Sequence, residues 1–213
     1  MRKRFTIAID GTFSSGKGTL ASKLAAHYGL PYLDTGKLYR AVAKRVIDAG
    51  TDPENGADCA VFATSLTPDE LSDPILKSGP IGAMASRVAV HPPVRAALLA
   101  FQQDFAAKGA VLDGRDIGTV ICPDAEVKLF VDADATERAR RRHLELTGYG
   151  EDITYEMVLA QLRERDARDS GRDIAPLKPA ENAHLLDTTN LSIERAFEVA
   201  ITLCDAVLAA KSV

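Results

Sequence analysis

Two glycines and a lysine near the start of the chain have the spacing of a phosphate-binding loop. Gly11, Gly16 and Lys17 fit the pattern G-x-x-x-x-G-K-[ST]. In such a loop several backbone N–H groups and the positive end of the next helix converge on one point, and the lysine supplies a mobile charge for the outer phosphates. The alternative is a tight strand-to-helix turn that happens to contain glycines. The apolar run before the loop and the helical pattern after it favour phosphate binding.

The last position of the pattern departs from the rule, because Gly18 stands where a hydroxyl residue usually contacts Mg²⁺. Thr19, one residue later, could take over part of that role, or water and phosphate oxygens could hold the metal, since Mg²⁺ keeps several waters. We therefore expect Mg²⁺ together with ATP, and we assign no protein residue as a metal ligand.

Arginines gather in one third of the chain and suggest a second phosphate-binding surface. If the helix continues through "RERDARDSGRD", Arg165, Asp169 and Arg172 share one face. That face could be solvated and ion-paired, or it could bind a partner that carries phosphate and hydroxyl groups. Arg138 and Arg142, four residues apart, repel each other on a helix and would welcome an anion between them. A solvated basic face explains that second pair equally well.

The stretch "LDGRDIG" places two charged side chains in a tight loop. Asp113 ends a buried strand, and Gly114 and Gly118 bracket Arg115 and Asp116. In an open α/β sheet, ligands bind at the carboxyl ends of the strands. A charged pair at this position therefore indicates a functional loop.

Strand and helix patterns alternate along the chain, which predicts an α/β fold with a parallel sheet covered on both faces. We expect strands over 5–10, 31–34, 110–114, 125–133 and 183–188. We expect helices over 17–28, 37–50, 94–107, 136–147, 154–169 and 192–211. The turn-rich segment 51–80 is interpreted as an inserted, partly irregular region outside the sheet.

Composition places the chain among ordinary globular proteins. Its 213 residues suffice for one domain, and a net charge of −4 argues against a general nucleic-acid or membrane-surface binder. The dispersed Cys59, Cys122 and Cys204 are typical of reduced thiols in a cytosolic protein, without structural zinc or disulfides. The first apolar run is too short for a signal peptide, and no stretch is long enough to span a membrane.

Six segments together resemble bacterial cytidylate kinases over nearly the whole length. They are "IAIDG…SSGKGTLA", "YLDTGKLYRAVA", "ASRVAVHPPVRAALLAFQQDFA", "LDGRDIGTVICPDAEVKLFVDA", "ERDARDSGRDIAPL" and "LLDTTNLSIE". The resemblance implies transfer of the γ-phosphoryl group of ATP to CMP or dCMP. It also implies a P-loop kinase fold with a five-stranded parallel sheet, a monophosphate-binding insertion and a small lid. This chain departs from the family in having a shortened insertion, over residues 51–85. We expect a cytoplasmic monomer whose partners are these small substrates.

The resemblance also assigns site residues. The ATP-binding residues would be Gly11, Thr12, Phe13, Ser14, Ser15, Gly16, Lys17, Gly18, Thr19, Arg138 and Arg142. The CMP-binding residues would be Thr35, Arg40, Ser86, Arg95, Arg115, Asp116, Arg165, Asp169 and Arg172. Lys17, Arg40, Arg115 and Arg172 would be catalytic.

Within the CMP site the resemblance gives each residue a role. Arg40, Arg115 and Arg172 would surround the phosphate, with Thr35 near it. Ser86, Arg95 and Asp116 would read cytosine, and Arg165 and Asp169 would hold the ribose hydroxyls. Phe13, although counted with the ATP-binding loop, is bulky for a phosphate loop, and the resemblance does not explain its ring.

The expected organisation is one kinase domain, with a core over 1–35 and 105–213, a monophosphate-binding region over about 36–104 and a lid over about 146–154. Two alternatives stay open. One is a P-loop kinase for UMP, shikimate or dephospho-coenzyme A. The other is a nucleotide switch that hydrolyses ATP slowly and has no acceptor.

Overall fold

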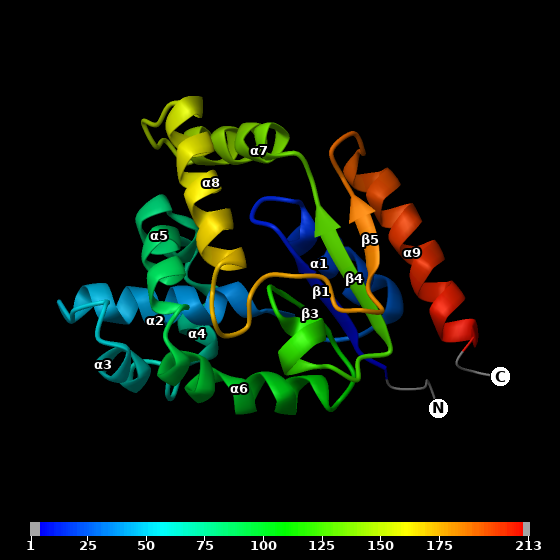
Figure 1. Ribbon diagram of the computed structural model, residues 1–213, viewed down its shortest axis with the longest axis horizontal. Helices are drawn as coiled ribbons and strands as arrows, with labels where there is room; N and C mark the ends of the chain where they lie inside the picture. Colours follow the sequence, from blue (N-terminus) through cyan, green and yellow to red (C-terminus); the bar gives the residue numbers. More distant parts are fainter. Residues whose placement is uncertain (1–4, 211–213) are drawn as a thin grey trace. The chain divides into compact units, whose positions relative to one another are not determined.

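The computed structural model describes residues 5–210 and contains a five-stranded sheet with the order β2-β3-β1-β4-β5 (Figure 1). The strands are β1 (Ile7–Gly11), β2 (Tyr32–Asp34), β3 (Val111–Gly114), β4 (Val127–Asp132) and β5 (His184–Asp187). β1 pairs in parallel with β3 and with β4, and β4 pairs in parallel with β5. The predicted α/β fold with a parallel sheet is confirmed.

The central position of β1 in the sheet explains the uninterrupted apolar run near the start of the chain. All five residues of β1 are buried, and Ile7 is paired with Val111 on one side and Val127 on the other. A strand with neighbours on both edges and helices over both faces has no solvated side, so alternation of polar residues is lost. β5, at the sheet edge, alternates instead.

Two helices share a core with the sheet, and two others form a core of their own. The helices are α1 (Lys17–Tyr28), α7 (Ala135–Gly148), α8 (Tyr155–Ser170) and α9 (Ile193–Ala210). Leu24 of α1 and Ala200 of α9 belong to the same buried cluster as the strands. Leu146 of α7 packs with Val158 and Leu162 of α8 in a separate cluster. We call these two helices the α7–α8 pair.

Helix ends fall where side chains can satisfy the first backbone N–H groups. The Asp134 side chain accepts a hydrogen bond from the Thr136 N–H, and the Thr154 side chain accepts one from the Met157 N–H. α7 accordingly begins one residue before its predicted start, and α8 begins one residue after its predicted start. The last residue of the predicted C-terminal helix, 211, lies outside the described residues.

The chain divides into two compact units, which are described separately. The first includes the strands up to Leu33 and everything from Phe105 onwards, and the second spans Asp34–Asp104. The assignment of this second unit to monophosphate binding stays a prediction.

The second unit is helical. Its elements are α2 (Thr35–Asp48), α3 (Gly56–Val61), α4 (Pro68–Ser72), a 3₁₀ helix (Pro74–Lys77), α5 (Gly79–Val88) and most of α6 (Pro92–Ala106). The segment 51–80 lies outside the sheet, as predicted, but it forms short helices rather than irregular loops. The sequence did carry their signals: Asn55 and Asp73 cap two of them, and Thr67 with Glu70 forms a capping box.

One side chain fastens these short helices to α2. Arg45 donates to both carboxylate oxygens of Glu70, at 2.6 and 2.8 Å, and to the carbonyl oxygens of Phe62, Thr64 and Ser65. The paired arginine and the capping box lower the pKa of Glu70 to about 2. A turn-rich sequence is thus ordered by one multidentate arginine.

No helix in the described part of the chain is long and apolar enough to cross a membrane. Cys59, Cys122 and Cys204 are buried free thiols.

Candidate active site

The phosphate loop joins the end of β1 to the start of α1, and its glycines have steric reasons. A Cβ on Gly11 would lie 1.9 Å from the carbonyl oxygen of Val131 on the neighbouring strand, so no other residue fits there. Gly16 has a φ of 87° at the helix N-terminus, a conformation that glycine adopts without strain. The pattern in the sequence therefore corresponds to a loop that must pass close to β4 and then turn sharply into α1.

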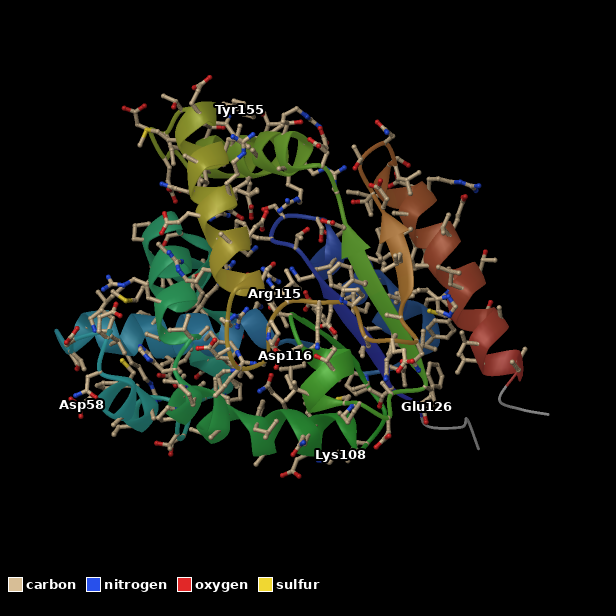
Figure 2. All side chains as sticks on the ribbon, in the orientation of Figure 1. Asp58, Lys108, Arg115, Asp116, Glu126 and Tyr155 are labelled. Carbon is tan, nitrogen blue, oxygen red and sulfur yellow. The ribbon has the colours of Figure 1, made fainter. Side chains whose placement is uncertain are left out.

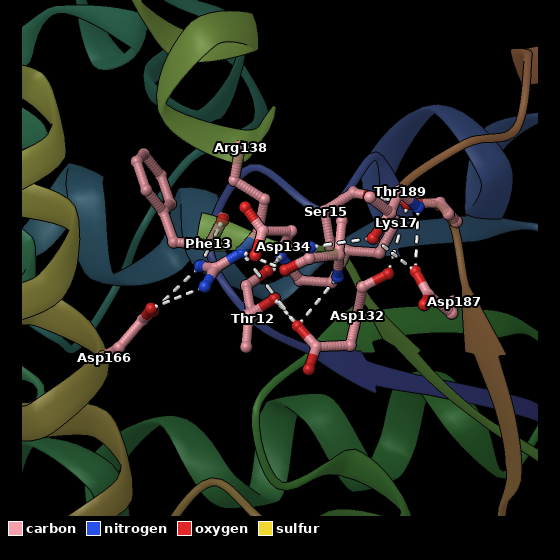
Figure 3. Close-up of polar contacts among 12 residues, drawn as sticks. Thr12, Phe13, Ser15, Lys17, Asp132, Asp134, Arg138, Asp166, Asp187 and Thr189 are labelled. Carbon is pink, nitrogen blue, oxygen red and sulfur yellow. Dashed lines mark hydrogen bonds and ion pairs between the residues drawn. The ribbon is translucent and has the colours of Figure 1, made fainter. Parts of the chain in front are cut away.

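The loop is held by contacts from the carboxyl ends of β4 and β5. Thr12 donates to Asp132 at 2.6 Å, and Thr188 donates to the Ser15 carbonyl oxygen at 2.8 Å. Lys17 is buried, and its ammonium lies 3.4 Å from the Thr12 carbonyl oxygen (Figure 3). The Lys17 ammonium thus lies over the loop, where it would bind phosphate oxygens together with the loop N–H groups.

A cavity of about 480 Å³ lies beside this loop. It is lined by Ser14, Ser15, Gly16, Thr19, Leu20, Glu137, Arg140, Arg141, Glu145, Thr188, Leu191, Ser192, Ile193 and Ala196. Its volume is within the range of small-molecule and cofactor sites. The mixture of apolar α9 side chains with arginines and hydroxyls suits a base next to phosphates.

Arg141 is the most firmly held arginine of this cavity. It donates to Glu137 at 2.8 Å and to the Thr188 carbonyl oxygen at 2.7 Å. One of its guanidinium nitrogens would lie 3.9 Å from a Cβ on Gly16, so the charge lies next to the N-terminus of α1. Sequence reasoning missed Arg141, because three adjacent arginines differ only in helical phase, and the phase that faces the loop depends on how α7 is placed.

The two arginines predicted for ATP, Arg138 and Arg142, do not themselves line the cavity, although Arg142 pairs with Glu145, which does. Arg138 is 5% exposed and donates to both carboxylate oxygens of Asp166 on α8, at 3.1 and 2.7 Å. It also donates to the Phe13 carbonyl oxygen at 3.2 Å (Figure 3). Arg142 is paired with Glu145 at 2.7 Å. Their predicted contacts with ATP stay predictions, and the geometry gives Arg138 a role in joining the loop to α8.

Three arginines converge on one buried carboxylate at the end of α8. Asp169 lies 2.9 Å from Arg115, 2.9 Å from Arg172 and 3.9 Å from Arg165. Figure 2 shows Arg115 beside this end of α8. Burial acts to raise the pKa of Asp169, but the charges of the three arginines outweigh it and hold the pKa below its ordinary value. The structure thus brings Arg115 to three predicted site residues at the end of α8, 50 or more positions further along the chain.

The loop after β3 is held by hydrogen bonds to Asp10, a buried acid that the sequence analysis did not assign. Asp10 accepts hydrogen bonds from the N–H groups of Ile117 at 2.7 Å and Gly118 at 2.8 Å. Burial raises the pKa of Asp10 to about 6. Asp10, at the end of β1, therefore positions the loop that carries Arg115 and Asp116. Asp116 is itself buried.

Asp113, at the end of β3, faces the start of α1. Its carboxylate accepts a hydrogen bond from the Tyr32 hydroxyl at 2.9 Å. A Cβ on Gly18 would lie 3.6 Å from Asp113 and 3.7 Å from the Tyr32 hydroxyl oxygen. Both are ordinary contact distances, so a side chain at position 18 would lie beside this carboxylate and the Tyr32 hydroxyl.

The other predicted CMP-binding residues belong to the second unit. Thr35 and Ser86 are buried at the start of α2 and within α5. Arg40 donates to the Leu76 carbonyl oxygen at 3.1 Å. Arg95 donates to the Ala89 carbonyl oxygen at 3.3 Å, and its guanidinium lies 5.7 Å from the centre of the Tyr39 ring. Their joint role with the Asp169 cluster stays a prediction.

A lysine-bearing, glycine-bounded loop between a central parallel strand and a helix, beside a nucleotide-sized cavity, defines a P-loop nucleotide-binding α/β protein. The family model described as "Cytidylate kinase" matches residues 7–206. The chain belongs to the cytidylate kinase family.

Curated relatives match almost end to end. A cytidylate kinase from Nitrobacter winogradskyi is 54% identical over 203 residues, covering 94% of this chain and 96% of the relative. A cytidylate kinase from Rhodopseudomonas palustris is 55% identical over 207 residues, covering 96% and 98%. A crystal structure of an uncharacterized protein from Eubacterium ventriosum has a TM-score of 0.54 at 16% identity, covering 95% of this chain and 99% of that one. This last likeness concerns the fold alone.

Proposed function

We propose that this protein transfers the γ-phosphoryl group of ATP to CMP or dCMP, forming ADP and CDP or dCDP. The observation that carries the proposal is the cluster of Arg115, Arg165 and Arg172 around Asp169, in the same unit as the phosphate loop. One phosphate site binds a nucleotide, whereas a second arginine site supplies a place for a phosphorylated acceptor. The family supports the cytosine nucleotide as that acceptor.

The donor half follows from the phosphate loop and its cavity. Lys17 and the loop N–H groups hold the β- and γ-phosphates, and the cavity beside Arg141 and Thr188 receives the adenosine part. Because Arg141 is fixed by Glu137 and by Thr188, it is already oriented before ATP arrives. Pre-oriented charges stabilise the negative charge that moves from the donor towards the acceptor.

The residues near the start of α1 fit Mg²⁺, which ATP brings with it. The Asp113 carboxylate faces Gly18, and Thr19 lines the cavity, so carboxylate and hydroxyl oxygens are both present. Among the described residues no group of three or more His, Cys, Asp and Glu side chains could hold a metal ion. Asp113 and Thr19 would therefore hold Mg²⁺ largely through water. When bound, Mg²⁺ neutralises charge on the phosphates.

The acceptor half follows from the charge of the arginine cluster. Three positive charges and the single negative charge of Asp169 leave two positive charges in these four side chains. Two positive charges match a phosphate monoester, which carries up to two negative charges at neutral pH. Arg115 and Arg172, together with Arg40, hold that phosphate in line with the donor, while Arg165 and Asp169 hold the ribose.

Cytosine specificity is assigned to Asp116, Ser86 and Arg95. Cytosine offers an amino group next to acceptor atoms, which a carboxylate together with a hydroxyl or guanidinium can satisfy. No general base is required, because the acceptor phosphate is already largely ionised at pH 7. Binding both substrates in line and excluding water are then the main contributions of the protein.

A panel assay tests the proposal. ADP release is measured with purified protein, ATP and Mg²⁺ against CMP, dCMP, UMP, AMP, GMP, shikimate and dephospho-coenzyme A. We expect turnover with CMP and dCMP that exceeds turnover with the other acceptors. Lys17→Ala should lower it by about a hundredfold or more, because a charge that stabilises the transition state is lost.

Three results would contradict the proposal. Preference for shikimate or dephospho-coenzyme A would indicate another small-acceptor kinase, and ADP release that no acceptor stimulates would indicate a nucleotide switch. Near-normal CMP-dependent ADP release by Lys17→Ala would remove the loop from the mechanism.

A further inference from the structure

Phe13 is the one bulky residue of the phosphate loop, and its ring contacts two arginines outside the loop. The Arg165 guanidinium carbon lies 4.1 Å from the centre of the ring, and that of Arg142 lies 5.4 Å away. Both distances are within the range of cation–π contacts. The ring also packs against the apolar cluster of the α7–α8 pair. Figure 3 shows the side chain leaving the loop on the side of α8.

The backbone of Phe13 is attached to the same helices. Its carbonyl oxygen accepts a hydrogen bond from Arg138, which in turn binds both carboxylate oxygens of Asp166 on α8. Ser14, the next residue, has a φ of 60°, a left-handed conformation that a non-glycine residue adopts only when its surroundings hold it there. The turn at Ser14 lets the loop continue to Gly16 while Phe13 stays with α8.

Arg165 links this contact to the arginine cluster. The carbon of its guanidinium lies over the Phe13 ring, and its Nε lies 3.9 Å from Asp169. A stacked and ion-paired guanidinium loses less conformational freedom when a ligand binds than a freely rotating one. The donor loop therefore touches the acceptor cluster through Phe13 and Arg165.

We propose that Phe13 is a positioning residue, which stacks on Arg165 to orient it towards the acceptor nucleotide and so couples the phosphate loop to the acceptor site. The inference rests on the proposed function, because it takes the Asp169 cluster as the acceptor site. It predicts that substitution of Phe13 changes the affinity for the acceptor, although Phe13 itself lies in the donor loop.

The test separates stacking from simple packing. Phe13→Leu keeps an apolar side chain against the α7–α8 cluster but removes the aromatic face, whereas Phe13→Tyr keeps the face. We expect Phe13→Leu to raise the KM for CMP about three- to tenfold, the range of a partly buried cation–π contact. The KM for ATP should stay within about twofold, and Phe13→Tyr should restore the KM for CMP to near the wild-type value.

A double-mutant cycle shows whether Phe13 acts through Arg165. Arg165→Met removes the charge and keeps the apolar stem. In that background Phe13→Leu should change the KM for CMP by less than about twofold, because its partner is already gone. If Phe13→Leu does not fold, as thermal unfolding would reveal, Phe13→Met replaces it in the same cycle.

Each result is decisive. The inference is overturned if Phe13→Leu leaves the KM for CMP unchanged, if it mainly raises the KM for ATP, or if its effect multiplies fully with that of Arg165→Met. If the wild-type protein phosphorylates CMP and any of these occurs, only this inference fails. If the wild-type protein does not use CMP, the proposed function fails first and this inference with it.

Discussion

At the scale of single residues, the pKa of a buried acid in this protein depends on the groups that are packed around it. Asp169 is buried with three arginines and stays ionised, whereas Asp10 is buried against backbone N–H groups and has a raised pKa. Both are aspartates at the end of a regular element. The difference comes from full positive charges around one and partial charges around the other. Residue type alone therefore does not fix what an acid can do.

Asp116 gives a prediction about specificity at this scale. It is 4% exposed, and we assign it to the cytosine amino group. Asp116→Ala should reduce the preference for CMP over UMP by about tenfold or more, since a buried amino group without an acceptor is costly. The measurement is the ratio of kcat/KM for the two nucleotides.

Asp124→Ala provides the matched control, because Asp124 is an exposed aspartate a few residues along the same stretch. The control should keep the wild-type ratio. An unchanged CMP-to-UMP ratio in Asp116→Ala would remove Asp116 from cytosine recognition.

At the scale of elements, α7 distributes its arginines over different faces. Arg138 and Arg142 contact α8, Glu145 and Phe13, while Arg141 contacts the loop after β5 and lies next to Gly16. Successive residues of a helix point about 100° apart, so one helix can serve both the α8 side and the nucleotide side. Arg141, which the sequence analysis did not assign, therefore has different surroundings from Arg138 and Arg142.

Arg141→Ala tests this division. The variant should raise the KM for ATP about tenfold or more, because it loses charge-assisted hydrogen bonds next to the phosphate loop, and should change the KM for CMP far less. Arg195→Ala is the control, since Arg195 also pairs with a glutamate on its own helix, Glu198, but its side chain is 65% exposed and does not line the cavity. Equal effects of the two substitutions on the KM for ATP would contradict the assignment of Arg141.

At the scale of the whole molecule, stability should respond to pH through two acids whose pKa values shift in opposite directions on folding. Glu70 has a folded pKa of about 2, so its contribution is complete above its ordinary pKa and is lost as the pH falls towards 2. Asp10 has a folded pKa of about 6, above its ordinary value of 3.8. Its contribution is complete below pH 3.8 and is lost as the pH rises through about 6.

Asp10→Asn isolates the second of these groups. We expect the difference in free energy of unfolding between wild type and Asp10→Asn to shrink as the pH rises from about 4 to about 6. Urea unfolding of both proteins across this range measures it. A difference that stays constant or grows with pH would show that burial does not raise the pKa of Asp10.

The strands and the longer helices, with the exception of α5 (Gly79–Val88), could be predicted because each of them has a strong local signal. The apolar β1, the capped α7 and the glycine-ended α1 are examples, and their ends differ from prediction by one or two residues. The short helices of 51–80 were missed because brief elements have little periodicity and depend on a distant residue, Arg45.

The sequence by itself determined the phosphate loop, the parallel α/β fold and the set of charged residues, because glycine spacing, apolar runs and family motifs are local in the chain. The tertiary structure decided which charges meet. Arg115 reaches Asp169, which shares its helix face with Arg165 and Arg172. Arg138 pairs with Asp166, and the Phe13 ring lies on Arg165. Such contacts join residues up to 152 positions apart. They form only when the sheet brings its strand ends to one edge, and no local pattern records that arrangement.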